Sequence, residues 1–166
     1  MYKVGDTVRY GGVGVCTVQK ICPIKDAALP GDYYVLSAVM RPGSVYYVPT
    51  QNPVLVARIS PLVTLSQIEK MFEAVRKSHC EWVHDFRKRG EIFRKAILSP
   101  DREELLLLMQ SVYRHQKELI KNGKHIHTTD DSFLHDAENI LFGEIAFVTG
   151  EPLGAVCERF RKLLNQ

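Results

Sequence analysis

The spacing of apolar residues changes once along the chain, at Ile59-Ser60-Pro61, and this change limits the possible folds. Before it, short β-branched or alternating runs are separated by glycine, proline and asparagine, as is typical of strands joined by turns. After it, apolar residues recur about every 3.6 positions, the period of a helix that buries one face. The sequence therefore predicts an α+β protein, with a β module over residues 1–60 and a helical module over residues 61–166.

The β module is expected to be a small antiparallel sheet that is strongly bent into a barrel. Its turn formers are Gly11-Gly12, Pro30-Gly31-Asp32, Pro42-Gly43 and Asn52-Pro53, which favour tight reversals of the chain. Glycines at position 5 and over 11–14 suit the sharp bends of such a barrel. The predicted strands cover residues 3–4, 7–10, 14–21, 33–39, 45–48 and 55–58.

The helical module is expected to be all-α, with about five helices. Thr64 is predicted to cap the first helix, and Pro152 to open the last. Ser99-Pro100 is predicted to cap a helix that ends at Asn122-Gly123, because glycine favours termination there. The predicted spans are residues 64–75, 80–98, 99–122, 128–150 and 153–164.

One stretch concentrates positive charge around the only tryptophan. Residues 76–95 carry seven Lys or Arg against three Asp or Glu, a local charge of +4, although the whole chain is only +3. Trp82 is followed along this stretch by Arg87, Lys88, Arg89 and Arg94. Such a combination is typical of a nucleic-acid contact, in which cations neutralise phosphates and the ring wedges against a base. The alternative is an amphipathic helix with Trp82 in the core and its charges solvated.

A second candidate surface is the strand SVYYVP, which contains Tyr46, Tyr47 and Val48. It places tyrosines and valines on alternate faces and ends in Pro49, which cannot continue a ladder. A strand with aromatics on an open edge can accept a partner's strand through main-chain hydrogen bonds. The alternative is that Tyr46 or Tyr47 covers the core of the small barrel.

Little in the sequence indicates catalysis, a cofactor or a metal. His125 and His127 lie near two aspartates but lack the second pair of ligands that would fix a metal geometry. The four cysteines are scattered without a Cys-x-x-Cys pair, as expected for reduced thiols. The N-terminus lacks the apolar core of a signal peptide, and no apolar run reaches transmembrane length. We therefore expect a cytoplasmic non-enzyme with no cofactor, no metal and no membrane contact.

Three features of the sequence resemble a known family. The opening KVGDTVRYGGVGVCTVQKI, the segment DYYVLSAVMRPGSVYYVPTQN and a helical half with one tryptophan resemble the CarD/CdnL group of bacterial transcription regulators. The resemblance covers the chain to about Thr149, and the family's N-terminal module is shared with the transcription-repair coupling factor. The opening and the YYVL and YVP segments are the more specific parts, whereas the helical half matches more loosely.

The resemblance implies a Tudor-like β module that binds the β subunit of RNA polymerase, and a helical domain that touches promoter DNA. In that family a tryptophan, here Trp82, wedges into the minor groove at the upstream edge of the melted bubble and stabilises the open complex. Phe86-Arg87 matches the aromatic and the arginine that follow it. Two places depart from the pattern, because Tyr47 and the pair His84-Asp85 stand where relatives commonly carry basic residues. The cations of residues 87–95 are expected to compensate for Asp85.

Two functional hypotheses follow from these observations. In the first, a monomer binds RNA polymerase through Tyr46, Tyr47 and Val48, and contacts promoter DNA with little sequence specificity. Its DNA-contacting residues would be Trp82, Arg87, Lys88, Arg89 and Arg94. Binding the partly melted state better than the closed duplex would then modulate open-complex stability. In the second, the protein is an interaction module that binds RNA polymerase or another partner without direct DNA contact. A stand-alone DNA-binding protein is least favoured, because the basic area is small.

Overall fold

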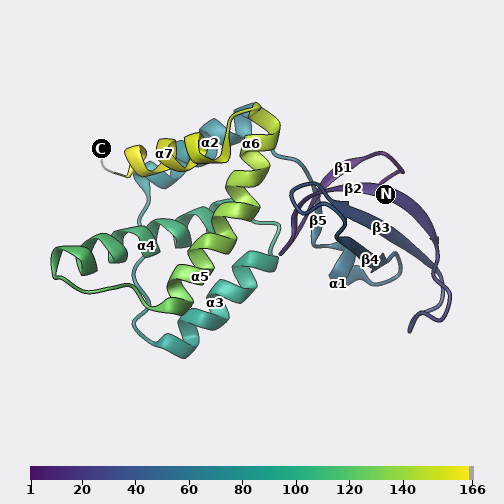
Figure 1. The fold of residues 1–166 in the computed structure, drawn as a ribbon, viewed down its shortest axis with the longest axis horizontal. Helices are drawn as coiled ribbons and strands as arrows, with labels where there is room; N and C mark the ends of the chain where they lie inside the picture. Colours follow the sequence, from purple (N-terminus) through teal and green to yellow (C-terminus); the bar gives the residue numbers. More distant parts are fainter. Residues whose placement is uncertain (165–166) are drawn as a thin grey trace.

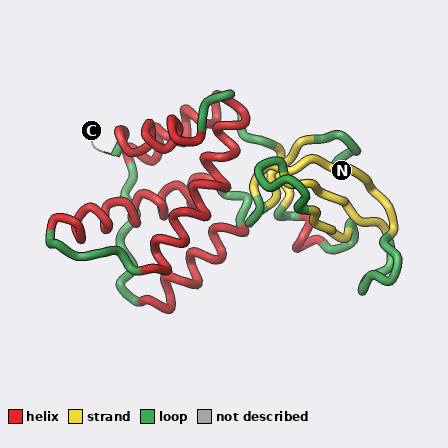
Figure 2. Tube along the Cα trace, viewed as in Figure 1, coloured by secondary structure: helices red, strands yellow, loops and turns green. Residues whose placement is uncertain are grey.

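The chain forms a β-sheet and a helical domain that lie side by side (Figure 1; Figure 2). A computed structural model describes residues 1–164. The sheet contains the first part of the chain, and all but one of the helices follow it in sequence. This arrangement confirms the predicted α+β class, with a Tudor-like β module followed by helices.

The β module is one antiparallel sheet that curves around its own core (Figure 1). Its strands are β1 (Thr7–Tyr10), β2 (Gly14–Pro23), β3 (Asp32–Ala38), β4 (Val45–Pro49) and β5 (Ile59–Pro61). Their order across the sheet is β4-β3-β2-β1-β5, so β4 and β5 are the edges. A register shift between Val18 and Lys20 places a bulge in β2, which increases the local bend. Buried residues such as Val8, Cys16, Leu36 and Val48 form the core.

Two strand predictions in this module were wrong. Residues 3–4 lie before β1 in a turn, where the Lys3 backbone N–H donates to the Asp6 carboxylate at 2.7 Å. The predicted strand over 55–58 is replaced by the short helix α1 (Pro53–Val56). Asn52 caps this helix by accepting from the Leu55 backbone N–H, and Pro53 fits its first position. The chain then returns to the sheet as β5, so the predicted boundary between residues 60 and 61 falls inside a strand.

The helical domain packs its helices around one apolar core (Figure 2). Its elements are α2 (Leu65–Lys77), α3 (Phe86–Leu98), α4 (Arg102–Lys121), α5 (Thr128–Ala137), the π-helical turn η1 (Glu138–Phe142), α6 (Gly143–Thr149) and α7 (Leu153–Leu163). Since α5, η1 and α6 continue one another as a rod, they correspond to the single helix predicted over 128–150. In the described part of the chain, no single helix meets the length and apolarity needed to cross a bilayer. Two consecutive helical segments, 128–149 and 153–163, reach this length and apolarity only when they are taken together, and the chain bends by 110° between them.

Several helix ends lie where the sequence predicts them. Thr64 and Gln67 form a reciprocal capping box at the start of α2. Asn122 ends α4, and Gly150 ends α6 in the left-handed conformation, with φ of 73°. These signals are local, because each cap bonds to a backbone group within one turn of itself.

Two other helix boundaries differ from the prediction. The helix predicted over 80–98 begins only at Phe86, so Trp82 lies in a loop and not on a helix. Asp85 is the N-cap that sets this start. The cap of α4 is Asp101 and not Ser99, which is instead the C-cap of α3. Asp101 accepts from the backbone N–H groups of Glu103 and Glu104, both at 3.0 Å.

The two modules approach each other at the level of the backbone. A Cβ atom added at Gly11, in the turn between β1 and β2, would lie 2.3 Å from the carbonyl oxygen of Leu98 at the end of α3. A Cβ added at Gly14 would lie 3.7 Å from the Cα of Ile140 in η1. The glycines of this turn therefore serve the contact between the modules as well as the bend that the sequence suggests.

Substituting Gly11 by alanine is expected to destabilise the protein by about 1–3 kcal/mol, because the added methyl would push against a carbonyl that cannot move freely. Urea denaturation would measure this change in the free energy of unfolding. The matched control is Gly90→Ala in α3, where an added Cβ meets nothing within 4 Å and helix propensity improves. A Gly11→Ala variant as stable as the wild type would contradict the close contact.

Candidate functional site

Trp82 lies in the loop of residues 78–85, which is anchored at both ends. Gln110 of α4 donates its side-chain amide to the carbonyl oxygens of Val75 (2.8 Å) and Ser78 (3.2 Å), where α2 ends. At the other end, the Asp85 carboxylate accepts from the Lys88 backbone N–H at 2.9 Å and starts α3. The path of the loop is therefore set by a neighbouring helix and by a cap.

Two side chains pack against the indole of Trp82. The ring of His115, from α4, stacks on it with centroids 3.9 Å apart and an interplanar angle of 17°. The guanidinium carbon of Arg89, from α3, lies over the ring at 4.5 Å from its centroid. An aromatic ring and a guanidinium group thus both pack against the indole. Trp82 remains partly exposed, and it also packs against the core of the helical domain.

Arg89 is buried and ties the tryptophan loop to α5. Its Nε and Nη2 donate to the two carboxylate oxygens of Asp130 at 2.7 and 3.0 Å, in a bidentate pair. Its Nη1 donates to the carbonyl oxygens of Val83 (2.7 Å) and His84 (3.3 Å). Arg89 is 7% exposed, which is at odds with the predicted direct contact to DNA. Its geometry fits a residue that positions Trp82.

The other predicted cations of this stretch are exposed. Arg87, Lys88 and Arg94 all project from α3 into solvent. Phe86, which is 47% exposed, lies next to them with its ring 4.8 Å from that of His127. These side chains can meet an anionic partner without rearrangement of the fold.

Asp85 has a structural role that the sequence comparison does not reveal. Its hydrogen bond with the Lys88 backbone N–H lowers the pKa of the carboxyl, with the nearby cations acting in the same direction. The acidic group is thus explained by the start of α3, at the positive end of the helix dipole. It nevertheless places a negative charge on an exposed surface between Trp82 and Arg87.

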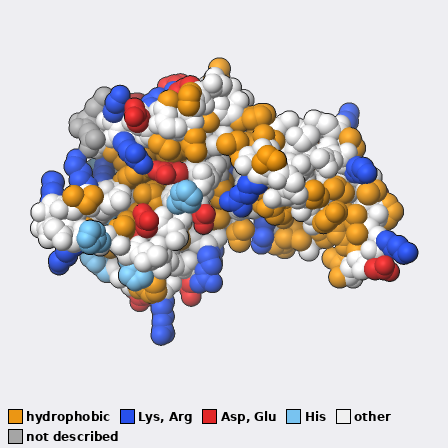
Figure 3. Space-filling model, viewed as in Figure 1, with side chains coloured by type: hydrophobic (Ala, Val, Ile, Leu, Met, Phe, Trp, Pro, Cys, Tyr) orange, Lys and Arg blue, Asp and Glu red, His pale blue; other side chains and the backbone are white. Residues whose placement is uncertain are grey.

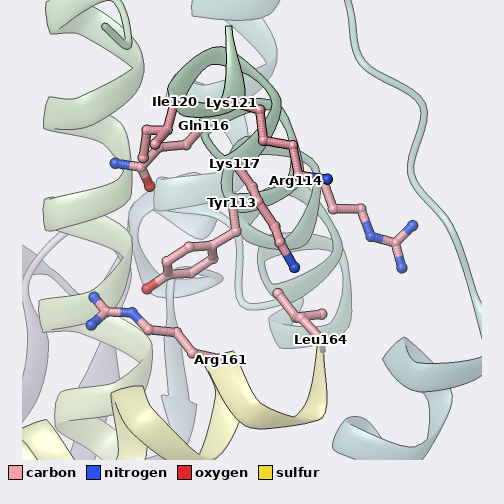
Figure 4. Close-up of a pocket in the computed structure, with 8 residues that line it drawn as sticks. All are labelled: Tyr113, Arg114, Gln116, Lys117, Ile120, Lys121, Arg161 and Leu164. Atoms are coloured by element: carbon pink, nitrogen blue, oxygen red, sulfur yellow. The ribbon is translucent and has the colours of Figure 1, made fainter. Parts of the chain in front are cut away.

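A second set of cations lies on α4 and α7, outside the stretch that the sequence singles out. Figure 4 shows the hollow that they border, with Arg114, Lys117 and Lys121 projecting from α4 and Arg161 from α7. The Tyr113 hydroxyl donates to Glu138, which also pairs with Arg161 at 3.3 Å. Burial is the main cause that raises the pKa of Tyr113. Arg114 also borders the depression beside Trp82, so positive charge continues from that site along α4.

The β module presents a mainly apolar surface at its edge strand β4 (Figure 3). The side chain of Tyr47 is 55% exposed and that of Val45 39% exposed, on one face of the strand. Tyr46 is half-buried against the sheet core, near Tyr10, with the ring centroids 6.3 Å apart. Val48 has no exposed surface, which is at odds with its predicted contact to RNA polymerase. Of the three residues predicted here, Tyr47 alone offers a largely exposed side chain.

One of the two histidines considered for metal binding, His127, has a structural role. His127 caps α5 by accepting from the Thr129 backbone N–H at 3.3 Å. Asp130, which follows His127 in the sequence, is buried, and its carboxylate is paired with Arg89. Over residues 1–164, no three His, Cys, Asp or Glu side chains come together in a group that could hold a metal ion.

Replacing Asp130 by asparagine is expected to loosen the tryptophan loop, because Arg89 would be left as a buried and unpaired charge. The predicted loss of unfolding free energy is about 3–5 kcal/mol, as for other broken buried pairs. Since the chain has one tryptophan, iodide quenching of fluorescence reports on Trp82 alone and should increase. The control is Asp131→Asn, an exposed neighbour on the same helix turn. Unchanged quenching in the Asp130 variant would show that the ion pair does not hold Trp82.

Comparison with known families identifies the N-terminal module. The sequence pattern of the CarD-like/TRCF RID domain family matches residues 2–63, which include all five strands of the sheet. This is a family of RNA polymerase-interacting domains and not of catalytic ones, so the match supports a transcription-related role that includes binding to RNA polymerase. The helical domain lies outside the matched residues, and no curated protein matches the chain. The β module of this protein is thus a CarD-like/TRCF RID domain.

Proposed function

We propose that the protein bridges RNA polymerase and promoter DNA and so modulates the stability of the open complex. In this proposal a cytoplasmic monomer binds the polymerase β subunit through its β module. Its helical domain meets promoter DNA near the upstream edge of the melted bubble. The observation that carries the DNA part is Trp82, a partly exposed tryptophan packed against His115 and Arg89, in the loop that leads into a helix with exposed cations.

On the polymerase side, the proposed contact is the β4 edge with Tyr47 and Val45. An edge strand has unpaired backbone groups that a partner's strand can bond, and exposed apolar side chains then add contact area. Because Tyr47 stands where relatives commonly have a basic residue, the contact here would depend on apolar and aromatic packing. Tyr46 and Val48 would support the strand from the core side.

On the DNA side, Arg87, Lys88 and Arg94 are proposed to neutralise phosphates while the edge of Trp82 enters the minor groove. Arg89 is proposed to act through Trp82, since its donors are directed at Asp130 and the loop backbone. Such a contact reads the shape and deformability of DNA more than its sequence. It fits a regulator that acts at many promoters.

The proposed mechanism is a shift in population between closed and open promoter complexes. A wedge that fits the partly melted duplex better than the closed duplex favours opening by the difference in its two affinities, and by no more. A coupling of about 1–2 kcal/mol would change the occupancy of the open complex several-fold. Rigid support of the Trp82 ring matters in this mechanism. If the ring were mobile, its ordering on binding would cost free energy and would reduce the difference between the two affinities.

A second candidate function is a protein-interaction module that binds polymerase without touching DNA. Two observations favour it, namely the exposed negative charge of Asp85 and the packing of Trp82 against His115, Arg89 and the helical core. It differs from the first proposal in what Trp82 does, so a variant at this residue separates them.

Substituting Tyr47 by glutamate is expected to weaken binding to RNA polymerase and to its isolated β-subunit N-terminal fragment by about tenfold or more, because a charge would enter an apolar contact. Titration of the labelled protein against each target would measure the two affinities. Tyr47→Phe is the matched control, since it keeps the ring and is expected to bind as the wild type does. Equal binding by the glutamate variant would rule out the β4 edge as the contact.

Substituting Trp82 by alanine is expected to shorten the lifetime of the open complex several-fold, toward that of polymerase alone, while polymerase binding is unchanged. The measurement is the rate of open-complex decay after a competitor is added. Trp82→Phe, which keeps an aromatic ring beside His115 and Arg89, should retain part of the effect. If the alanine variant acts like the wild type, DNA contact through Trp82 fails and the interaction-module proposal is preferred.

A further inference from the structure

A buried carboxylate lies at the junction of the two modules. Glu144, on α6, has no exposed surface. Arg102 of α4 donates to its two oxygens from Nε at 2.9 Å and from Nη2 at 2.6 Å. The same Nη2 donates to the carbonyl oxygen of Pro61, the last residue of β5, at 2.7 Å. Arg102 therefore links the carboxylate to an edge of the sheet.

The connection between the modules is tied to the same carboxylate. The backbone N–H of Val63 donates to Glu144 Oε1 at 2.8 Å. Val63 belongs to the short segment between β5 and α2, which would otherwise be the natural pivot between the modules. A hydrogen bond from this segment to a buried group opposes such a pivot, because opening it would leave the carboxylate short of a donor.

The third partner comes from β1, which lies between β2 and the edge strand β5. Arg9 lies on β1 with its side chain on the face opposite to Val8, and it has no exposed surface. Its Nη1 donates to the carbonyl oxygen of Ser99 at the end of α3 (3.1 Å), and its Nε lies 3.6 Å from Glu144 Oε2. Burial lowers the pKa of Arg9 to about 10, with Glu144 acting in the opposite direction. The residue is thus a cation at neutral pH, and its attraction to Glu144 is mainly coulombic.

We infer that Arg9, Glu144 and Arg102 form a lock that fixes the angle between the two modules, with Arg9 as its positioning residue on the sheet side. This inference rests on the proposed bridging function and states how the bridge works. When β4 is bound to polymerase, a fixed angle places Trp82 at one position relative to the polymerase. If the modules pivoted freely, Trp82 would occupy many positions relative to the polymerase. Fixing one of these positions on DNA contact would then cost free energy and would weaken the coupling between polymerase binding and DNA contact.

The test compares Arg9→Met with the wild type. Methionine keeps an unbranched apolar side chain, and Glu144 keeps its bonds to Arg102 and Val63. The matched control is Lys77→Met, which removes a cation from an exposed pair with Glu73 inside the helical domain. Small-angle scattering measures the distribution of module orientations, and open-complex decay measures the promoter effect. Both variants are expected to bind the polymerase β fragment with an affinity within about twofold of that of the wild type.

The lock predicts a broader scattering distribution for Arg9→Met and a loss of about fivefold or more in open-complex lifetime, with Lys77→Met unchanged. A variant with the wild-type scattering distribution would overturn the role of Arg9 as the positioning residue of the lock. A broader distribution with the full promoter effect would overturn its role in bridging. If the wild type itself has no promoter effect, the proposed function fails, while scattering still decides whether the lock exists.

A measurement on the wild type tests the lock even if the Arg9→Met variant does not fold. Hydrogen exchange of the Val63 amide, which bonds to Glu144, reports directly on opening of the junction. The lock predicts protection close to that of the most protected core amides, such as those of α4. Exchange of Val63 at the rate of an exposed loop amide would show that the junction opens freely and would overturn the inference.

Discussion

A carboxylate with no access to water needs hydrogen-bond donors and cations around it, and this requirement organises the protein around Glu144. Its partners come from β1, from α4 and from the segment that leads into α2. The modules therefore cannot separate without stripping a buried charge of its neighbours. The close approach of Gly11 to Leu98 follows from the same junction, since any larger residue would hold the sheet away. The position of β4 relative to Trp82 depends on this contact.

The tryptophan loop is held by a second pair of the same kind. Arg89 and Asp130 are buried together, and the remaining donors of Arg89 fix the backbone of Val83 and His84. Arg89, which the sequence predicts to contact DNA, is instead a buried support. The positive surface is correspondingly smaller than the charge count suggests, and the proposed DNA contact rests on Arg87, Lys88, Arg94 and the indole edge. Rigidity, more than total charge, distinguishes this site.

The sequence predicts those features that depend on neighbours along the chain. The cap at Thr64 and the helix ends at Asn122 and Gly150 are local signals, and each lies where it is expected. The start of α3 was missed because apolar spacing continues through residues 80–85, whereas Gln110 and Asp85 divide the two helices. The candidate site was predicted only in part for a similar reason. Tyr47 and Trp82 can be singled out by type, but the burial of Val48 and Arg89 depends on β3 and on Asp130, which is 41 residues away from Arg89.

The central claim is that polymerase binding and DNA contact are coupled through one rigid body. Thermodynamic linkage requires that a protein which favours the open complex also binds the open complex more tightly than it binds polymerase alone. Titrating the labelled protein against polymerase and against a preformed polymerase–promoter open complex measures both affinities directly. The account predicts binding to the open complex that is tighter by about fivefold or more. Equal affinity for the two targets would contradict it and would leave a polymerase-binding protein whose helical domain does not engage the promoter.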